Sequence, residues 1–217
     1  MAIQIQSFQF NSFQENTFIV WDHHNNCIII DPGCYNRDEQ QEILDFIVTN
    51  ELKPLALLNT HAHIDHVLGN SFIKKTFQLD YYLHPSDATT LKSVASYAHL
   101  YGFEGYEVSP DPDIFLEHNQ LLHFGEIKIK VLFTPGHSPG HVVFYFPDEN
   151  FVVNGDVLFQ GSFGRVDLPG GDLETLKKSI FETMFKLPDD TIVYCGHGPE
   201  TTIGREKQFN YIHQFQF

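Results

Sequence analysis

The sequence predicts an α/β protein. Short apolar runs typical of strands are interspersed along the chain with stretches whose apolar residues recur at helical spacing. Four of the apolar runs end at turns that contain Gly or His and carry a side chain able to bind a metal ion. Because the 217 residues include no linker-like or repetitive segment, we expect one domain over residues 1–217.

The expected elements follow in chain order. Ile3-Gln4-Ile5-Gln6 alternates as a strand does. Further strands are expected at residues 17–21, 27–30, 54–59, 81–83, 127–133, 142–146, 151–153 and 191–193. Helices are expected at residues 39–49, 67–77 and 86–102. Asp172 is expected to cap a further helix that shows one apolar face, made by Leu173, Leu176, Ile180 and Met184.

The strand at residues 54–59 runs into the densest group of ligand-type side chains. His61, His63, Asp65 and His66 lie within six positions. A rigid buried strand that ends in such a loop is how α/β proteins position a site. Two histidines at i and i+2 can meet one ion on an extended or turning segment, and the Asp-His pair after them can turn toward a second ion.

Three later segments repeat this pattern. Thr134-Pro135-Gly136-His137, Asn154-Gly155-Asp156 and Tyr194-Cys195-Gly196-His197 each follow an apolar run. Unrelated surface histidines and turn acids are the alternative interpretation. Four occurrences at strand ends favour a metal site instead.

The motifs HAHIDH, TPGH, GD and GH, in this order, resemble those of the metallo-β-lactamase superfamily. The segments NGDVLFQGSFGRVDLPGGD and CGHGPETTIGREKQFN resemble a short, single-domain branch of glyoxalase II-like hydrolases. The resemblance implies a four-layer αββα sandwich with two divalent metal ions. Zn²⁺ is expected first, and Fe or Mn are also compatible with these ligands.

The resemblance also divides the ligands. His61, His63 and His137 would hold the first ion, Asp65, His66 and His197 the second, and Asp156 would bridge the two. It implies hydrolysis by water that the ions activate, without a serine or cysteine nucleophile. Asp65 is the expected catalytic residue, orienting that water in addition to binding metal.

The expected activity is hydrolysis of a small acyl thioester such as a hydroxyacylglutathione. The chain stops soon after His197, so we expect it to lack the C-terminal helical domain with which two-domain relatives hold glutathione. It also has Gly161-Ser162-Phe163-Gly164-Arg165 where the family reads Gly-Cys-Gly-Arg. Three alternatives remain: a lactone or β-lactam hydrolase, a mononuclear iron persulfide dioxygenase, and a metal-binding module without activity.

Several other residues have two interpretations. Arg165 either binds a substrate carboxylate or forms a buried ion pair with Asp167. Asp31 and His141 are expected to stabilise turns or to support the ligands. A packed thiol is expected at Cys195, and exposed turn positions at His23 and His24. The aromatic segment at residues 86–117 forms either a wall of the substrate cleft or a packed surface helix.

Composition limits the partners. A formal net charge of −15 argues against nucleic acid and anionic membranes. The N-terminus has no secretory signal pattern, and no apolar segment is long enough to span a bilayer. Three cysteines, an odd number, predict a reducing and therefore cytoplasmic setting. The sequence does not fix the oligomeric state.

Overall fold

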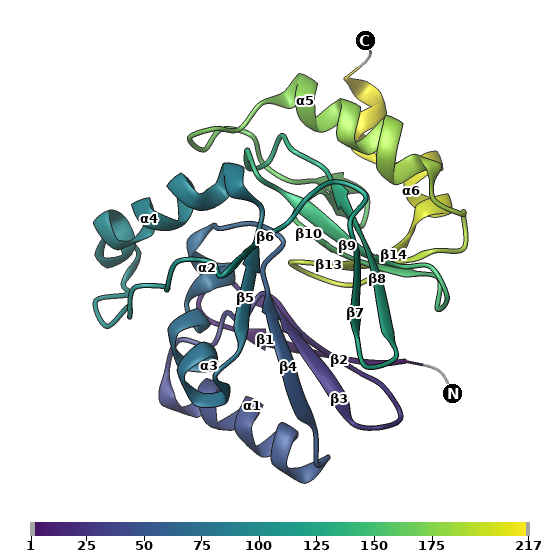
Figure 1. Cartoon of the computed structure of the whole chain (residues 1–217). Coiled ribbons are helices and arrows are strands. Elements are labelled where there is room, and N and C mark those ends of the chain that lie inside the picture. Colours follow the sequence, from purple (N-terminus) through teal and green to yellow (C-terminus); the bar gives the residue numbers. More distant parts are fainter. Residues whose placement is uncertain (1–2, 216–217) are drawn as a thin grey trace. The chain divides into compact units, whose positions relative to one another are not determined.

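The computed structural model describes residues 3–215, and these form two compact units. The first unit contains the chain up to residue 116 together with residues 123–127. The second unit contains residues 117–122 and the chain from residue 128 onward. Each unit is built around one mixed β-sheet, and the two are described in turn (Figure 1).

The sheet of the first unit has six strands in sequential order. They are β1 (Gln4–Phe10), β2 (Glu15–Trp21), β3 (Asn26–Ile30), β4 (Lys53–Leu58), β5 (Asp80–Leu83) and β6 (Ile114–Phe115). The pairs β1–β2 and β2–β3 are antiparallel, whereas β3 to β6 pair in parallel. The strand β3 is buried after its first residue and β4 is buried over its second half, which explains the apolar runs at the ends of both strands.

Helices cover one face of this sheet. They are α1 (Arg37–Thr49), α2 (Ile64–Val67), α3 (Asn70–Phe77) and α4 (Ala88–Tyr97), with 3₁₀ turns at Pro85–Asp87 and Ala98–Tyr101. The helix α1 begins with a capping box, in which Asn36 and Glu39 each satisfy the other's backbone N–H. Ile43 and Ile47 of this helix belong to the same core cluster as Ile29 of the sheet.

The sheet of the second unit has the order β14-β13-β10-β9-β8-β7. Its strands are β7 (Leu121–Phe124), β8 (Ile127–Phe133), β9 (Val142–Phe146), β10 (Phe151–Gly155), β13 (Ile192–Cys195) and β14 (Thr201–Thr202), and a separate ribbon joins β11 (Leu158–Phe159) to β12 (Ser162–Phe163). The pair β10–β13 is parallel and the pairs β8–β9, β9–β10 and β13–β14 are antiparallel. Residues 123–127, at the tip between β7 and β8, group with the first unit.

One helical layer lies on this second sheet. The helix α5 (Leu173–Lys178) continues as a π-helix (Ser179–Thr183) and a 3₁₀ turn (Met184–Lys186), and α6 (Ile203–Phe209) precedes a 3₁₀ turn (Tyr211–Gln214). As predicted, Asp172 caps α5, accepting a hydrogen bond from the Thr175 N–H at 2.7 Å. Leu176, Ile180 and Met184 are buried in one cluster, although the segment changes its helical winding twice.

Most predicted elements are confirmed, and one prediction is wrong in detail. The helix expected at residues 67–77 begins only at Asn70, as α3, and a separate short helix, α2, ends at Val67, before Gly69. A side chain at Gly69 would lie 2.4 Å from Cys34 Sγ, so the chain turns where the backbone is crowded. The strands β6, β11, β12 and β14 were not predicted, because two-residue strands show no periodicity. The strand β7 and the helix α6 were not predicted either. No helix in residues 3–215 is long and apolar enough to cross a membrane.

Candidate metal centre

The first unit gathers the ligand-type side chains that follow β4. His61 and His66 are fully buried, and His63 is nearly so. His63 is the N-cap residue of α2, and Asp65 and His66 lie on that short helix. The parallel strands β3 and β4 end side by side, which is where open α/β sheets place their sites.

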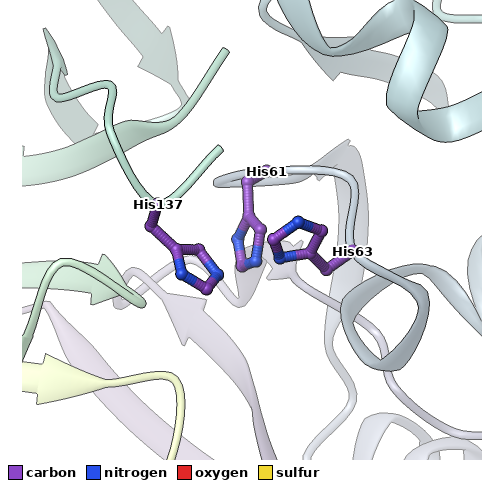
Figure 2. Close-up of side chains that lie close together, drawn as sticks. All are labelled: His61, His63 and His137. Carbon is purple, nitrogen blue, oxygen red and sulfur yellow. The ribbon is translucent and has the colours of Figure 1, made fainter. Parts of the chain in front are cut away.

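Two pairs of these side chains are close enough to share an ion. His66 Nε2 lies 3.7 Å from Asp65 Oδ2. The rings of His61 and His63 stand edge to face, with centroids 4.8 Å apart and an interplanar angle of 87° (Figure 2). These are the pairs that the sequence assigned to the second and first ions respectively.

Asp31 fixes the tautomers of two of the histidines. Its Oδ2 accepts from the Thr60 hydroxyl at 2.6 Å and lies 3.1 Å from His66 Nδ1. Because that hydroxyl has already donated its proton, its oxygen accepts from His61 Nδ1, 3.0 Å away. Both rings therefore carry their proton on Nδ1 and their lone pair on Nε2, the form that binds a metal.

The Asp31 carboxylate is itself strongly held. Its Oδ1 accepts from the Thr60 N–H at 2.7 Å and from Asn59 Nδ2 at 3.1 Å. The residue has a φ of 50°, in the left-handed region that aspartate tolerates in turns. Both expected roles of Asp31, in a turn and in supporting a ligand, are present in the structure.

A further buried carboxylate, Glu15, was not singled out from the sequence. Its Oε1 lies 3.7 Å from His66 Nδ1, and its Oε2 accepts from the Thr17 hydroxyl at 2.9 Å. Burial raises the pKa of Glu15 well above its ordinary value, and the charges of Asp31 and Asp65 act in the same direction against the lowering effect of His66. A lone carboxylate early in the chain carries no motif, so only the fold reveals this contact.

The second unit places Asp156 between two histidines. Its Oδ2 lies 3.5 Å from His137 Nε2 and 3.5 Å from His197 Nε2. His137, also labelled in Figure 2, follows β8, while Asp156 and His197 follow β10 and β13. Since β10 and β13 are parallel neighbours, their ends meet, and the Gly196 N–H donates to the Gly155 carbonyl at 2.7 Å.

Backbone groups orient these side chains. His137 Nδ1 lies 2.7 Å from the carbonyl oxygen of Arg165, which keeps its proton on Nδ1 and its lone pair on Nε2. The Asp156 N–H donates to His141 Nε2 at 3.1 Å, so His141 contacts the backbone of a predicted ligand. A side chain at Gly164 would lie 1.9 Å from the Asp156 carbonyl oxygen, so only glycine fits there. In the sequence, the only sign that residue 164 lies so close to Asp156 is that it is a glycine.

Arg165 corrects one expectation. Its guanidinium makes a bidentate ion pair with Asp167, with two N–O distances of 2.7 Å. The pair was expected to be buried, but its side chains are 61% and 68% exposed. The hydrogen bonds from Arg165 hold the pKa of Asp167 down to about 2. An exposed ion pair contributes little to stability, which removes the reason for a purely structural role.

None of the cysteines has the properties of a nucleophile. Cys27, Cys34 and Cys195 are buried, and burial raises the pKa of the Cys27 and Cys195 thiols to about 12 and that of Cys34 further. A reactive cysteine needs a lowered pKa and access to solvent. The packed thiol expected at Cys195 is confirmed.

The donor atoms within each unit fit divalent metal ions. Two ligands on a tetrahedral Zn²⁺ with bonds of about 2.1 Å lie about 3.4 Å apart. The separations of 3.5 Å around Asp156 and 3.7 Å between Asp65 and His66 are close to this value. Imidazole and carboxylate donors suit Zn²⁺, Fe²⁺ and Mn²⁺, so the ligand types do not select one metal.

Comparison with known proteins identifies the family. The sequence profile of the metallo-beta-lactamase superfamily matches residues 11–197, and the chain belongs to this family. It is 41% identical over 197 residues to a probable metallo-hydrolase, YqgX, of Bacillus subtilis, covering 89% of each chain. It is also 34% identical over 209 residues to a hydroxyacylglutathione hydrolase, GloC, of Haemophilus influenzae, covering 96% of this chain and 97% of that one.

Solved structures agree with the family assignment. The crystal structure of BLEG-1 B3 metallo-beta-lactamase matches with a TM-score of 0.88 and 35% identity, covering 96% of this chain and 98% of that one. TTHA1623, crystallised in a di-iron-bound form, matches with a TM-score of 0.85 and 38% identity, covering 95% and 98%. The predicted fold class, an α/β protein of the metallo-β-lactamase type, is therefore confirmed.

Proposed function

We propose that this protein is a dinuclear metal-dependent hydrolase of small acyl thioesters. The observation that carries the proposal is the position of Asp156, whose Oδ2 lies at the same 3.5 Å from the imidazoles of His137 and His197. A carboxylate between two imidazoles is suited to bridging two ions. Membership of a metallo-hydrolase family supports the same interpretation.

The proposed ligand set is the one expected from the sequence. His61, His63 and His137 would hold the first ion, Asp65, His66 and His197 would hold the second, and Asp156 would bridge both. The close pairs within the first unit and the two histidines around Asp156 in the second unit are compatible with this division. No residue has to serve both ions except Asp156.

The side chains around these ligands have defined roles in the proposal. Two bound ions would supply Lewis acidity, which lowers the pKa of a water molecule and polarises a carbonyl group. Asp31 and Thr60 keep the lone pairs of His61 and His66 on Nε2. Asp65 would orient such a water molecule, because its side chain is 13% exposed while the histidines beside it are buried. His141 and Gly164 hold the backbone of Asp156 in place.

Two observations favour a thioester as the substrate. One relative that matches over nearly the whole chain is a hydroxyacylglutathione hydrolase. In addition, an aromatic group that includes Phe13, Tyr97 and Tyr101 lies in the first unit near Asp65. Burial and the charge of Asp65 raise the pKa of Tyr97 to about 12, so its phenol stays neutral beside a proposed ligand. This group offers an apolar surface for an acyl chain.

The test combines metal content with a panel of substrates. Metal-replete protein is analysed for metal per chain, and kcat/KM is measured for lactoylglutathione, an uncharged thioester, a lactone and a penicillin. After dialysis against metal-free buffer, which removes weakly held ions, we expect two ions per chain, and we expect the highest kcat/KM for a thioester. Asp156→Asn should lower it at least about a hundredfold, because even residues behind the ligands change activity by about 10–100-fold. His123→Gln, on an exposed histidine of β7, is the matched control and should change nothing.

Two results would overturn the proposal. A protein that holds two ions per chain but hydrolyses no thioester would exclude thioesters as the substrate. A protein that consumes oxygen with glutathione persulfide after iron loading would instead be a dioxygenase.

Hydrolysis of a β-lactam is the second candidate function, because the 35% identical BLEG-1 is described as a B3 metallo-beta-lactamase. Faster turnover of the penicillin than of any thioester would establish it.

A further inference from the structure

A second group of metal-ligand side chains lies in the first unit, away from the residues proposed for catalysis. His23 and His24 occupy the turn between β2 and β3, and Glu126 lies at the tip between β7 and β8. One ligand atom from each residue lies within 4.8 Å of the other two. Asp31 follows the opposite end of β3, a strand of five residues or about 17 Å. This group is therefore separate from the candidate metal centre.

The distances within the group are those of ligands around one ion. His23 Nδ1 lies 3.6 Å from Glu126 Oε2, and His24 Nε2 lies 3.7 Å from Glu126 Oε1. Hydrogen bonds would bring these atoms to about 2.7–3.2 Å. Ligands that share a Zn²⁺ ion stand about 3.4 Å apart. The separations therefore fit a shared ion better than two hydrogen-bonded ion pairs.

The burial of His23 gives independent support. Its Nδ1 atom is buried and has no hydrogen-bond partner among residues 3–215. A buried polar atom that makes no such bond is destabilising unless something else satisfies it. An ion held between His23 and Glu126 would do so, and the 61% exposed side chain of His24 leaves room for water as a further ligand.

Asp22 fixes the backbone on which the three ligands stand. Its Oδ1 accepts from the His24 and Asn26 N–H groups at 2.8 and 2.9 Å. Its Oδ2 accepts from the Glu126 N–H at 3.0 Å and from Asn26 Nδ2 at 2.9 Å. A side chain at Gly125 would lie 2.5 Å from that oxygen, so glycine lets the second turn approach. One buried carboxylate thus positions both ligand-bearing turns before any ion binds.

We propose that His23, His24 and Glu126 form a second, solvent-open binding site for a divalent transition-metal ion. Two imidazoles and one carboxylate with an open position suit Zn²⁺ and, among other ions, Cu²⁺ and Ni²⁺. Lys53 contacts the turn through its Nζ, which donates to the His24 carbonyl oxygen at 3.4 Å rather than to a ligand atom. The carboxylate of Glu126 remains available to the ion.

The experiment counts ions on protein whose catalytic centre is already filled. Tag-free holoprotein is dialysed against micromolar Zn²⁺, and metal per chain is compared for the wild type, Glu126→Gln and His24→Gln. We expect the wild type to hold one ion more than either variant, with thioester hydrolysis unchanged in all three. The control is His99→Gln, an exposed histidine that should retain the additional ion.

A second measurement locates the ion. Substoichiometric Cu²⁺ added to the ¹⁵N-labelled holoprotein should broaden the amide signals of His24 and Glu126 first, and this order should disappear in Glu126→Gln. Glu126→Gln keeps the backbone N–H that binds Asp22, so it tests the site even if His24→Gln does not fold. Equal metal content in the wild type and Glu126→Gln, or loss of the additional ion in His99→Gln as well, would overturn the proposal.

Discussion

The position of the Asp156 carboxylate depends on its neighbours. Its backbone N–H donates to His141, and its carbonyl lies against Gly164, where any side chain would collide. These contacts hold Oδ2 at an equal distance from His137 and His197. At the scale of single residues, the proposed bridging role of Asp156 therefore depends on its fixed backbone as much as on its carboxylate.

Substitution of Asp156 should affect both proposed ions, whereas substitution of His197 should affect one. We expect Asp156→Ala to lower the affinity for both ions by at least about tenfold, because ligands that act as a unit are lost non-additively. After dialysis against metal-free buffer, which empties the solvent-open site at His23, His24 and Glu126, His197→Ala should leave close to one ion per chain. Metal titration of the two variants, followed by elemental analysis, measures this. Equal stoichiometry in both would contradict the bridging role.

The sequence supplied the ligand-type residues but only some of the groups that orient them. Histidine and aspartate at strand ends form a pattern that can be read directly, and Asp31 and His141 each stand beside a Pro-Gly turn. The carbonyl of Arg165 and the buried Glu15 could not be found in this way. Every residue has a carbonyl, and a single glutamate has no partner until the fold brings one to it.

At the scale of elements, the break between α2 and α3 has a physical cause. The apolar spacing predicts a helix over residues 67–77, yet α3 begins only after Gly69, and residues 64–67 form the separate helix α2. The Gly69 N–H donates to the Pro32 carbonyl at 2.8 Å, and Cys34 lies against its Cα. Sequence periodicity reports which face is apolar, but it does not report where another segment of backbone approaches.

Gly69→Ala should therefore destabilise the protein. The added methyl group would lie 2.4 Å from Cys34 Sγ and 2.8 Å from the Pro32 carbonyl oxygen. We expect a loss of about 2–3 kcal/mol in the free energy of unfolding, typical of overpacking. Urea denaturation measures it, and Gly102→Ala, where the space is open but φ is +85°, should cost only about 1 kcal/mol. Removing Sγ with Cys34→Ala should recover part of the loss. Additive effects of the two changes would contradict this explanation.

The free energy of unfolding should depend on pH through Asp22, which lies in the turn between β2 and β3. Burial alone would raise its pKa, but hydrogen bonds from Glu126, Asn26 and His24 leave the pKa below its ordinary value of 3.8. A lowered pKa means that the folded state binds this proton less readily than the unfolded state. The stabilisation is thus present above about pH 4 and is lost as the pH falls through the lower, folded-state value.

Asp22→Asn tests this dependence. The variant cannot lose the carboxylate charge, so its free energy of unfolding should fall less steeply below about pH 4 than that of the wild type. At pH 7 it should be less stable by about 2 kcal/mol, since the charged acceptor of four hydrogen bonds is replaced. Urea unfolding from pH 2.5 to 7 provides both numbers. Parallel curves for the two proteins would assign the acid sensitivity to other groups.

At the scale of the whole molecule, the fold class and the family followed from four strand-end motifs. The substrate did not, because the chemistry at the ligands suits any accessible carbonyl. Selectivity must come from side chains remote from the reacting carbon, and these carry no motif in the sequence. The net charge of −15 is expected to affect selectivity, because it disfavours the binding of anionic substrates unless a local cation compensates.

Arg165 is the candidate for that cation. Because it pairs with Asp167, substitutions of the two residues should change substrate binding in opposite directions. We expect kcat/KM for lactoylglutathione and for an uncharged thioester to differ by about tenfold or less, or roughly 1.4 kcal/mol. Arg165→Met should raise KM for the acidic substrate more than for the neutral one. Asp167→Asn should do the opposite, because it releases a guanidinium now held by two bonds of 2.7 Å. Both side chains are exposed, so neither change should unfold the protein. Steady-state kinetics with both substrates and both variants measures these effects. KM values that change equally for the two substrates would exclude carboxylate recognition by Arg165. A preference for lactoylglutathione above about a hundredfold would mean that other residues of the chain determine selectivity.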